Sequence, residues 1–302
     1  MTRIYRFKPK EPTPQVAGWQ VADVIGGNKR PDFTRPLLPE SFARTEAMAF
    51  LDDEERRVLN QIRGRGYVHV LGLIDAFILP FVLGHGRLLL NGDGSVRSVL
   101  QIAAEEAKHI QLFERFRAVF DRSFGSPCEG IDATDEIRRT VLAADPLAAA
   151  LVVLMAEGMI QSHYSETVEN DMAIDPLFKN LLRHHALEEA EHVRFHLQIV
   201  DSLARGLDAA AIDRAIDDFF AIAARLDAAL AEQVVHDIVA FERATGRVLT
   251  GAERETFRRV QHQAQRWTFL WSGMRHPSFV ATLDRLGEEV RNRITEAAPA
   301  FG

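Results

Sequence analysis

One heptapeptide pattern occurs twice in this sequence, and both copies carry a glutamate and a histidine at a spacing that can bind a metal ion. Residues 103–109 and 186–192 both read Ala-x-Glu-Glu-Ala-x-His. In each copy the second glutamate precedes the histidine by three residues, so on an α-helix the carboxylate and the imidazole share one face. The two candidate pairs of metal ligands are Glu106 with His109 and Glu189 with His192.

Two further acids stand inside apolar stretches. Asp75 interrupts LGLIDAFILP, and Glu157 interrupts LVVLMAEGMI. Burial of an unpaired carboxylate costs several kcal/mol, and no basic residue follows nearby, so these acids indicate that divalent metal ions neutralise them. Two alternatives stay open: Asp75 caps a neighbouring helix or pairs with an arginine, and Glu166 or Glu169 takes the place of Glu157.

These groups follow one another in the order that a di-metal helical bundle needs. Ferritin-like di-iron and di-manganese bundles take one acid from each of two helices and Glu-x-x-His from each of the other two. The repeat is explained if the two Glu-x-x-His helices face each other across a pseudo-two-fold axis and each supplies the same ligands to its own ion. Carboxylates and imidazoles with open positions suit iron(II) or manganese(II).

Other acids and histidines lie close to these ligands in the sequence. His185 shares the stripe of Glu189, one turn earlier, and we expect a third imidazole ligand there; the alternative is a core histidine bonded to the backbone. Glu105 and Glu188 lie about 100° from the ligand glutamates and are either partners of the ligands or solvated. Glu191 and His184 are expected at the surface, and His163, His196, His236 and His262, which lie outside the stripe or lack an acid partner, are expected to be structural.

Helices must position these side chains, and helical signals run from Asp52 almost to the end of the chain, whereas strand signals are nearly absent. We expect helices near 52–88, 96–120, 135–170 with a break near Asp145, 176–205, 208–244, 250–275 and 278–297. Their boundaries are marked by Asp145-Pro146, Asp175-Pro176, the capping box of Thr250 and Glu253, and the stops at Gly206 and Gly246. The sequence therefore predicts an all-α fold, a ferritin-like four-helix bundle with additional C-terminal helices and an extended N-terminal arm.

The division of the chain follows from the same pattern. Residues 1–45 are expected to form the extended arm, and residues 46–302 a single ferritin-like helical domain. Within it the metal-binding bundle covers about 52–205 and the additional helices about 206–298. The dipeptide Asp93-Gly94 is expected to connect two helices.

Composition limits the partners and the compartment. The net charge of −7, with no long basic run, argues against a nucleic-acid partner. The single cysteine, Cys128, fits a reducing, cytoplasmic setting. The apolar stretch 67–84 is long enough to approach a membrane span, but Asp75 and Pro80 interrupt it, so we expect a buried core helix and no membrane partner.

The ligand pattern resembles the di-iron N-oxygenases typified by the p-aminobenzoate N-oxygenase of aureothin biosynthesis. The resemblance rests on His185-x-x-x-Glu189-x-x-His192, where that family has its third imidazole, and spans roughly residues 50–205. It implies two iron ions, with manganese as the alternative, and it implies O2, an electron donor and a small organic substrate oxidised at an amine nitrogen. One departure is Asp75, where the family has glutamate; the shorter arm draws the carboxylate back, so an arylamine substrate is not carried over.

Three other functions remain open. One is ferritin-like metal storage, although the helices after Arg205 exceed what a storage cage needs. Another is a radical-generating subunit, although Phe113 stands where such subunits usually have tyrosine. The third is a di-metal oxidase of a fatty-acid-like ligand, which the apolar Leu71, Ile78, Phe113 and Val153 would suit as well as they suit an ordinary core. The long amphipathic helices after Gly206 could also pair in a homodimer.

Overall fold

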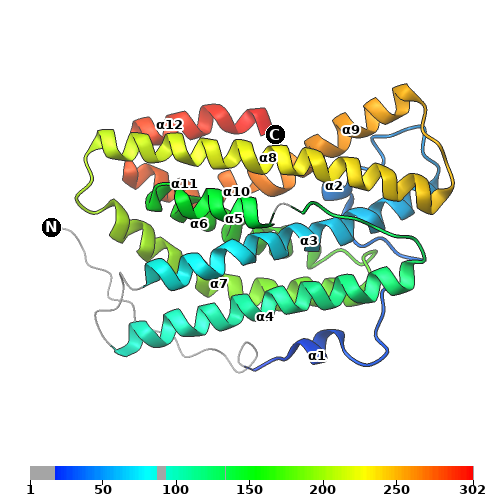
Figure 1. The fold of residues 1–302 in the computed structure, drawn as a ribbon, viewed down its shortest axis with the longest axis horizontal. Coiled ribbons are helices and arrows are strands. Elements are labelled where there is room, and N and C mark those ends of the chain that lie inside the picture. The colour runs from blue at the N-terminus through cyan, green and yellow to red at the C-terminus, as the bar shows by residue number, and fades with distance from the viewer. Residues whose placement is uncertain (1–17, 87–92, 133, 302) are drawn as a thin grey trace.

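Four long helices form the body of the protein around a common interior (Figure 1). The computed structural model describes residues 18–86, 93–132 and 134–301, and within these ranges it contains helices and no strand. The four are α3 (Asp53–His85), α4 (Asp93–Phe124), α6 (Pro146–Ser162) and α7 (Pro176–Ala204). α3 packs chiefly on α4 and α6 on α7, while contacts between α4 and α7 and between α3 and α6 close the ring. The described chain is the all-α, ferritin-like bundle that the sequence predicts.

The apolar helices are core helices. α6 buries every residue from Leu147 to Ile160, which is the pattern of a helix surrounded by protein on all sides. The most apolar windows of Asp53–His85 and Pro146–Val168 are long enough to cross a membrane, yet 72% and 83% of them, respectively, are buried inside the molecule. The burial of these two helices in the core therefore accounts for their apolar composition over a length that could cross a membrane.

Capping side chains begin and end the helices close to the predicted boundaries. Asp145 accepts a hydrogen bond from the backbone N–H of Leu147, and Asp175 accepts one from Phe178. α8 (Ala209–Thr245) ends at Gly246, which has a φ of 72° that favours glycine. The other described helices after Gly130 are α5 (Thr134–Ala143), the π-helical turn η2 (His163–Val168), α9 (Gly251–Arg266), the π-helical turn η3 (Trp267–Trp271), α10 (Ser272–Met274), α11 (Pro277–Leu286), α12 (Glu288–Ala297) and the 3-10 turn η4 (Ala298–Phe301).

Two local predictions are wrong. The helix expected over 278–297 is two helices, because Gly287 has a φ of 137° that an α-helix cannot contain. Asp93-Gly94 is not a connection, since α4 begins at Asp93.

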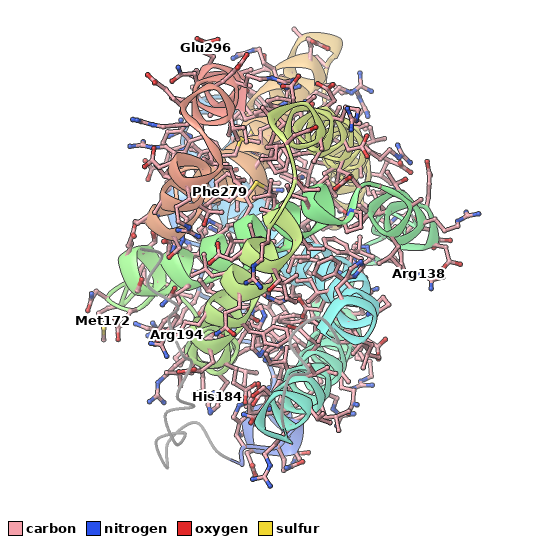
Figure 2. The ribbon with its side chains drawn as sticks, turned by 90° about the vertical axis from the view of Figure 1, so that its left-hand side faces the viewer. Arg138, Met172, His184, Arg194, Phe279 and Glu296 are labelled. Atoms are coloured by element: carbon pink, nitrogen blue, oxygen red, sulfur yellow. The ribbon has the colours of Figure 1, made fainter. Side chains whose placement is uncertain are left out.

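The C-terminal helices cover the bundle on the side of α3 and α6, as the end-on view in Figure 2 shows. α8 packs on both of these helices, and a buried ion pair between Arg63 and Asp237 joins α3 to α8 at 3.5 Å. α6 lies so close to the turn before α11 that a Cβ at Gly158 would lie 2.6 Å from the His276 ring. The additional helices thus seal the side of the bundle that carries Glu157.

The N-terminal segment also packs on the bundle. α1 (Val21–Ile25) contacts α4 and α7, and α2 (Glu40–Ala43) contacts α3 and α9. The side chain of Asn60 fixes the segment between them, because its oxygen accepts from the backbone N–H groups of Leu37 and Leu38 and its nitrogen donates to the carbonyl of Leu38. The part of the predicted arm before Gly18 lies outside the described residues.

Candidate metal centre

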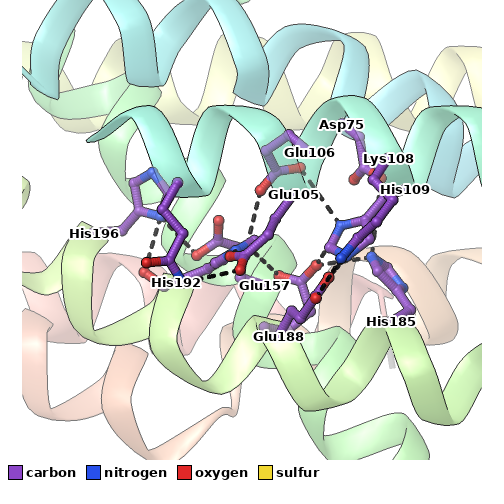
Figure 3. Close-up of polar contacts among 12 residues, drawn as sticks. Asp75, Glu105, Glu106, Lys108, His109, Glu157, His185, Glu188, His192 and His196 are labelled. Carbon is purple, nitrogen blue, oxygen red and sulfur yellow. Dashed lines mark hydrogen bonds and ion pairs between the residues drawn. The ribbon is translucent and has the colours of Figure 1, made fainter. Parts of the chain in front are cut away.

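The seven predicted ligands all lie in the interior of the bundle, and Figure 3 labels six of them, all except Glu189. They are Asp75 on α3, Glu106 and His109 on α4, Glu157 on α6, and His185, Glu189 and His192 on α7. Each of them is at most 1% exposed. Four helices therefore deliver four carboxylates and three imidazoles to a space without solvent.

Ligand atoms of six of these residues gather into two overlapping groups, each with its atoms within 4.8 Å of one another. The groups are Glu106, His109, Glu189 and His192, and Asp75, His109 and His185. Glu157 belongs to neither, and its Oε2 lies 2.7 Å from Nδ1 of His196. The structure thus brings six predicted ligands together and turns Glu157 to one side of them.

Most of the candidate ligand atoms are buried without a hydrogen-bond partner. They are both oxygens of Asp75, Glu106 and Glu189, Oε1 of Glu157, Nδ1 of His109 and His192, and both ring nitrogens of His185. Among the described residues, the ion pairs of these carboxylates are with histidines and with neither lysine nor arginine. Buried polar atoms in this state are costly, and divalent cations held between them would satisfy the oxygens and nitrogens together. The donor set therefore fits a pair of metal ions.

The two copies of the repeat hold each other's histidines. Nε2 of His109 on α4 lies 2.8 Å from Oε2 of Glu188 on α7, and Nε2 of His192 on α7 lies 2.9 Å from Oε2 of Glu105 on α4. In each copy, then, the first glutamate binds the histidine of the opposite helix, while the second glutamate is a candidate ligand. Glu105 and Glu188 are therefore hydrogen-bond partners of the candidate ligands and not solvated side chains.

This crossed arrangement fixes which nitrogen of each imidazole faces the metal centre. Burial raises the pKa of Glu188, but the hydrogen bonds from His109 and Lys108 outweigh that effect and the net pKa is lowered. Glu188 is therefore an ionised acceptor for the Nε2–H of His109, which leaves the Nδ1 lone pair pointing inward. Nδ1 of His109 lies 3.4 Å from Oε1 of Glu189, and Nδ1 of His192 lies 2.9 Å from Oε1 of Glu106.

The geometry does not support the alternative roles considered for His185 and Asp75, or the replacement of Glu157 by another acid. His185 makes no backbone hydrogen bond; its Nε2 lies 2.8 Å from Oε1 of Glu189 and 3.9 Å from Oδ2 of Asp75. Asp75 neither caps a helix nor pairs with an arginine within the described chain, since both of its oxygens lack a hydrogen-bond partner. Glu166 and Glu169 are exposed.

Three of the other histidines meet acids that the sequence did not reveal: Nε2 of His262 lies 2.8 Å from Oδ1 of Asp227, Nδ1 of His236 lies 3.9 Å from Oε2 of Glu129, and His196 meets Glu157. His196 has an acid partner, Glu157, and is fully buried one turn after His192. The spacing of four residues from His192 was the signal that could have revealed it. His163 is structural as expected: its ring nitrogens lie 2.9 Å from the hydroxyl of Tyr67 and 2.9 Å from that of Ser272.

Without a cation, three of the four ligand carboxyls favour the protonated form, whereas, despite burial, the neighbouring His185 and His192 hold the pKa of Glu189 well below its ordinary value. Burial, reinforced by the charges of Glu106 and Glu189, raises the pKa of Asp75 well above its ordinary value. Burial also raises the pKa of Glu157 well above its ordinary value and that of Glu106 to about 7. Protons would thus neutralise in part what metal ions neutralise when bound.

A cavity lies beside the metal centre, between α3, α4 and the loop before α5. Its volume is about 360 Å³, which is in the range of small-molecule sites. It is lined by His69, Gly72, Leu73, Ala76, Ile110, Phe113, Glu114, Arg117, Gly130, Ile131 and Asp132. Phe113 lines this cavity and also contacts the candidate ligand His185, whose ring centroid lies 4.9 Å from that of Phe113.

A second, apolar cavity between α3 and α8 measures about 30 Å³, which is room for little more than a water molecule.

Comparison with known protein families places most of the chain in one family. A family model described as P-aminobenzoate N-oxygenase AurF matches residues 19–254, well over half of the chain. This range contains all seven candidate ligands and the two glutamates that hold the histidines. The comparison with curated proteins found no match.

Removal of the charge on the histidine-holding glutamates tests the crossed arrangement. We expect Glu188→Gln and Glu105→Gln each to lower the affinity for iron(II) or manganese(II) roughly 10- to 100-fold, because the imidazole they orient loses basicity and position. The affinity is measured by competition with a chelator.

Glu191→Gln is the matched control, since Glu191 is the third acid of the same heptapeptide and pairs with Arg194 at the surface. Its affinity should equal that of the wild type. Equal losses in all three variants, or a loss in none, would contradict the crossed roles.

The raised pKa values predict a pH dependence of metal binding. The carboxyl of Glu106, whose pKa burial raises to about 7, is still largely protonated at about pH 6 and must lose that proton to bind a cation, so affinity should rise as the pH increases through about 7. Calorimetric titration with manganese(II) in buffers of different ionisation enthalpy would measure the protons released, and fewer should be released at about pH 8 than at about pH 6. An affinity that stays constant over this interval would show that the acids are already ionised.

Proposed function

Because the chain belongs to the p-aminobenzoate N-oxygenase family, we propose that it is a di-iron oxygenase that oxidises a small organic molecule at an amine nitrogen. The proposal assigns two iron ions to Asp75, Glu106, His109, Glu157, His185, Glu189 and His192, with manganese as the alternative metal. It also assigns the enzyme to the cytoplasm, where the single Cys128 would stay reduced.

One observation carries this proposal: the buried and unpartnered donor atoms that converge from α3, α4 and α7. Bound iron ions would supply the electrons and the open coordination positions that activate O2. The chain itself performs three tasks. Its carboxylates balance the charge of the cations, Glu105 and Glu188 hold the inward tautomers of the histidines, and the surrounding helices exclude water from the reaction.

The cavity between α3 and α4 supports a substrate site on the outer side of this centre. Along their helices, the lining residues Ala76 and Ile110 directly follow the candidate ligands Asp75 and His109, whereas His69 and Arg117 lie about two turns away from those ligands. Arg117 follows the candidate ligand His109 by eight residues, which corresponds to about 12 Å along the helix. A one-ring molecule and the arginine side chain together span that length.

The chemistry of this cavity favours a substrate with an acidic group. Arg117 makes no hydrogen bond or ion pair with the described residues, and its Nε is buried without a partner. His69 donates its Nε2–H to the carbonyl of Ile131, and its Nδ1 is likewise buried and unpartnered. Glu114 and Asp132 are exposed at the mouth. We therefore propose an amino acid-like or arylamine carboxylate whose acidic group lies at Arg117 and whose amine points toward the metal ions.

Iron loading tests the proposed function directly. We expect anaerobic addition of iron(II) to give two bound ions per chain, and exposure to O2 in the presence of p-aminobenzoate or a related aminocarboxylate to give the N-oxidised product, measured by mass spectrometry. Conversion of excess iron(II) to a ferric mineral, with no product from an amine panel, would favour storage instead.

Arg117→Gln tests the substrate orientation. Loss of a charged hydrogen bond should raise KM for an aminocarboxylate roughly tenfold or more, and it should leave iron content and the KM of the corresponding amide unchanged. Arg122→Gln is the control, because Arg122 is exposed in the last turn of the same helix. An unchanged KM for the carboxylate in Arg117→Gln would place the acidic group elsewhere.

A further inference from the structure

An indole ring lies at the outer end of the hydrogen-bonded chain that runs through Glu188 to the candidate ligand His109. Trp19 is 9% exposed, and its Nε1–H donates to Oε1 of Glu188 at 2.9 Å. The ring also stacks on the candidate ligand His109, with 6.3 Å between centroids and 12° between planes. Trp19 thus contacts both the candidate ligand and the carboxylate that orients it.

These contacts form a continuous path from near the surface to the metal centre. The indole N–H meets one oxygen of Glu188, and the other oxygen of Glu188 accepts from His109 at 2.8 Å. The far nitrogen of the same imidazole faces Glu189. Since the candidate ligands are at most 1% exposed, a protein-sized electron donor docked at the surface would not contact them directly.

The other half of the pseudo-two-fold site shows that an indole is not needed to orient a histidine. There Glu105 accepts from His192 at 2.9 Å, and its other oxygen accepts from the side-chain amide of Gln101 at 3.0 Å. An amide at the surface suffices to hold that carboxylate. The aromatic ring on the Glu188 side therefore calls for a separate explanation.

The proposed reaction supplies one. Oxidation of an amine to a hydroxylamine by O2 places one oxygen atom in the product and the other in water, so two electrons must come from an outside donor. Resting on that function, we propose that Trp19 is the entry point for these electrons and that they pass through Glu188 and His109. Each transfer oxidises one donor molecule by one electron and reduces one iron(III) to iron(II); two transfers restore the iron(II) pair, and no bond forms or breaks along the path.

Lys108 defines the outer face of this entry point. Its ammonium lies 4.0 Å from the centroid of the indole and 2.5 Å from Oε1 of Glu188, and the side chain is 20% exposed. A cation over the ring disfavours a positive charge on the indole. Trp19 therefore conducts electrons inward through its π system and its hydrogen bond without itself being oxidised.

The test follows reduction of the iron rather than turnover. Wild type and the variants Trp19→Leu and Trp19→Phe are loaded with two iron ions, oxidised, and mixed without oxygen with reduced methyl viologen, a one-electron donor. The loss of iron(III) absorbance gives the rate of reduction. We expect Trp19→Leu to be slower by roughly tenfold, and Trp19→Phe, which keeps a ring but loses the N–H, to lie between the two.

Trp271→Leu is the control, because Trp271 stacks on Trp267 and Arg275 in the C-terminal helices and should leave the rate unchanged. Rates of reduction are compared only in variants that hold two irons. If Trp19→Leu does not bind two irons, the rate of Trp19→Phe tests the proposal. A wild-type rate in either iron-replete Trp19 variant would contradict the proposal. Failure of the proposed function would look different, because the wild type would then bind and reduce iron yet oxidise no amine.

Discussion

Four carboxylates share an interior with three imidazoles, and no lysine or arginine of the described chain pairs with them. Taking such groups out of water is costly unless an opposite charge comes with them. This constraint explains the rest of the architecture, because four separate helices give up apolar core positions to bring inward one acid each and, from α4 and α7, one and two histidines respectively. A pair of divalent cations is the neutralising charge that suits both the oxygens and the nitrogens of this set.

The pseudo-two-fold relation between α4 and α7 extends beyond the ligands. In each heptapeptide the second glutamate and the histidine are candidate ligands. The first glutamate accepts a hydrogen bond from the histidine of the other helix. A change in the separation or rotation of the two helices would break both supports at once, so the bundle and the metal centre stabilise each other. The two halves differ outside the heptapeptides: only α7 adds a third imidazole, His185, and one supporting glutamate meets Gln101 whereas the other meets Trp19 and Lys108.

Much of this could be predicted from the sequence, because periodicity and spacing are local. The Glu-x-x-His pairs, the acids in apolar stretches and the stripe of His185 each follow from positions on a single helix. The roles of Glu105 and Glu188 could not be decided, since each depends on the opposite helix. The same holds for His196, whose partner Glu157 comes from α6, and for Trp19, which stands 169 residues from the glutamate that it binds. Packing sets the partners in such long-range pairs, so sequence spacing can place His196 on the face of His192 but cannot show which residue it meets.

The account is tested most directly by anomalous diffraction at the iron absorption edge from crystals soaked anaerobically in iron(II). It predicts two peaks inside the bundle, roughly 3.5–4 Å apart, with the Nδ1 atoms of His109 and His192 and the carboxylates of Asp75, Glu106 and Glu189 directed at them. The absence of peaks in this interior, or iron bound only to acids at the surface, would contradict it.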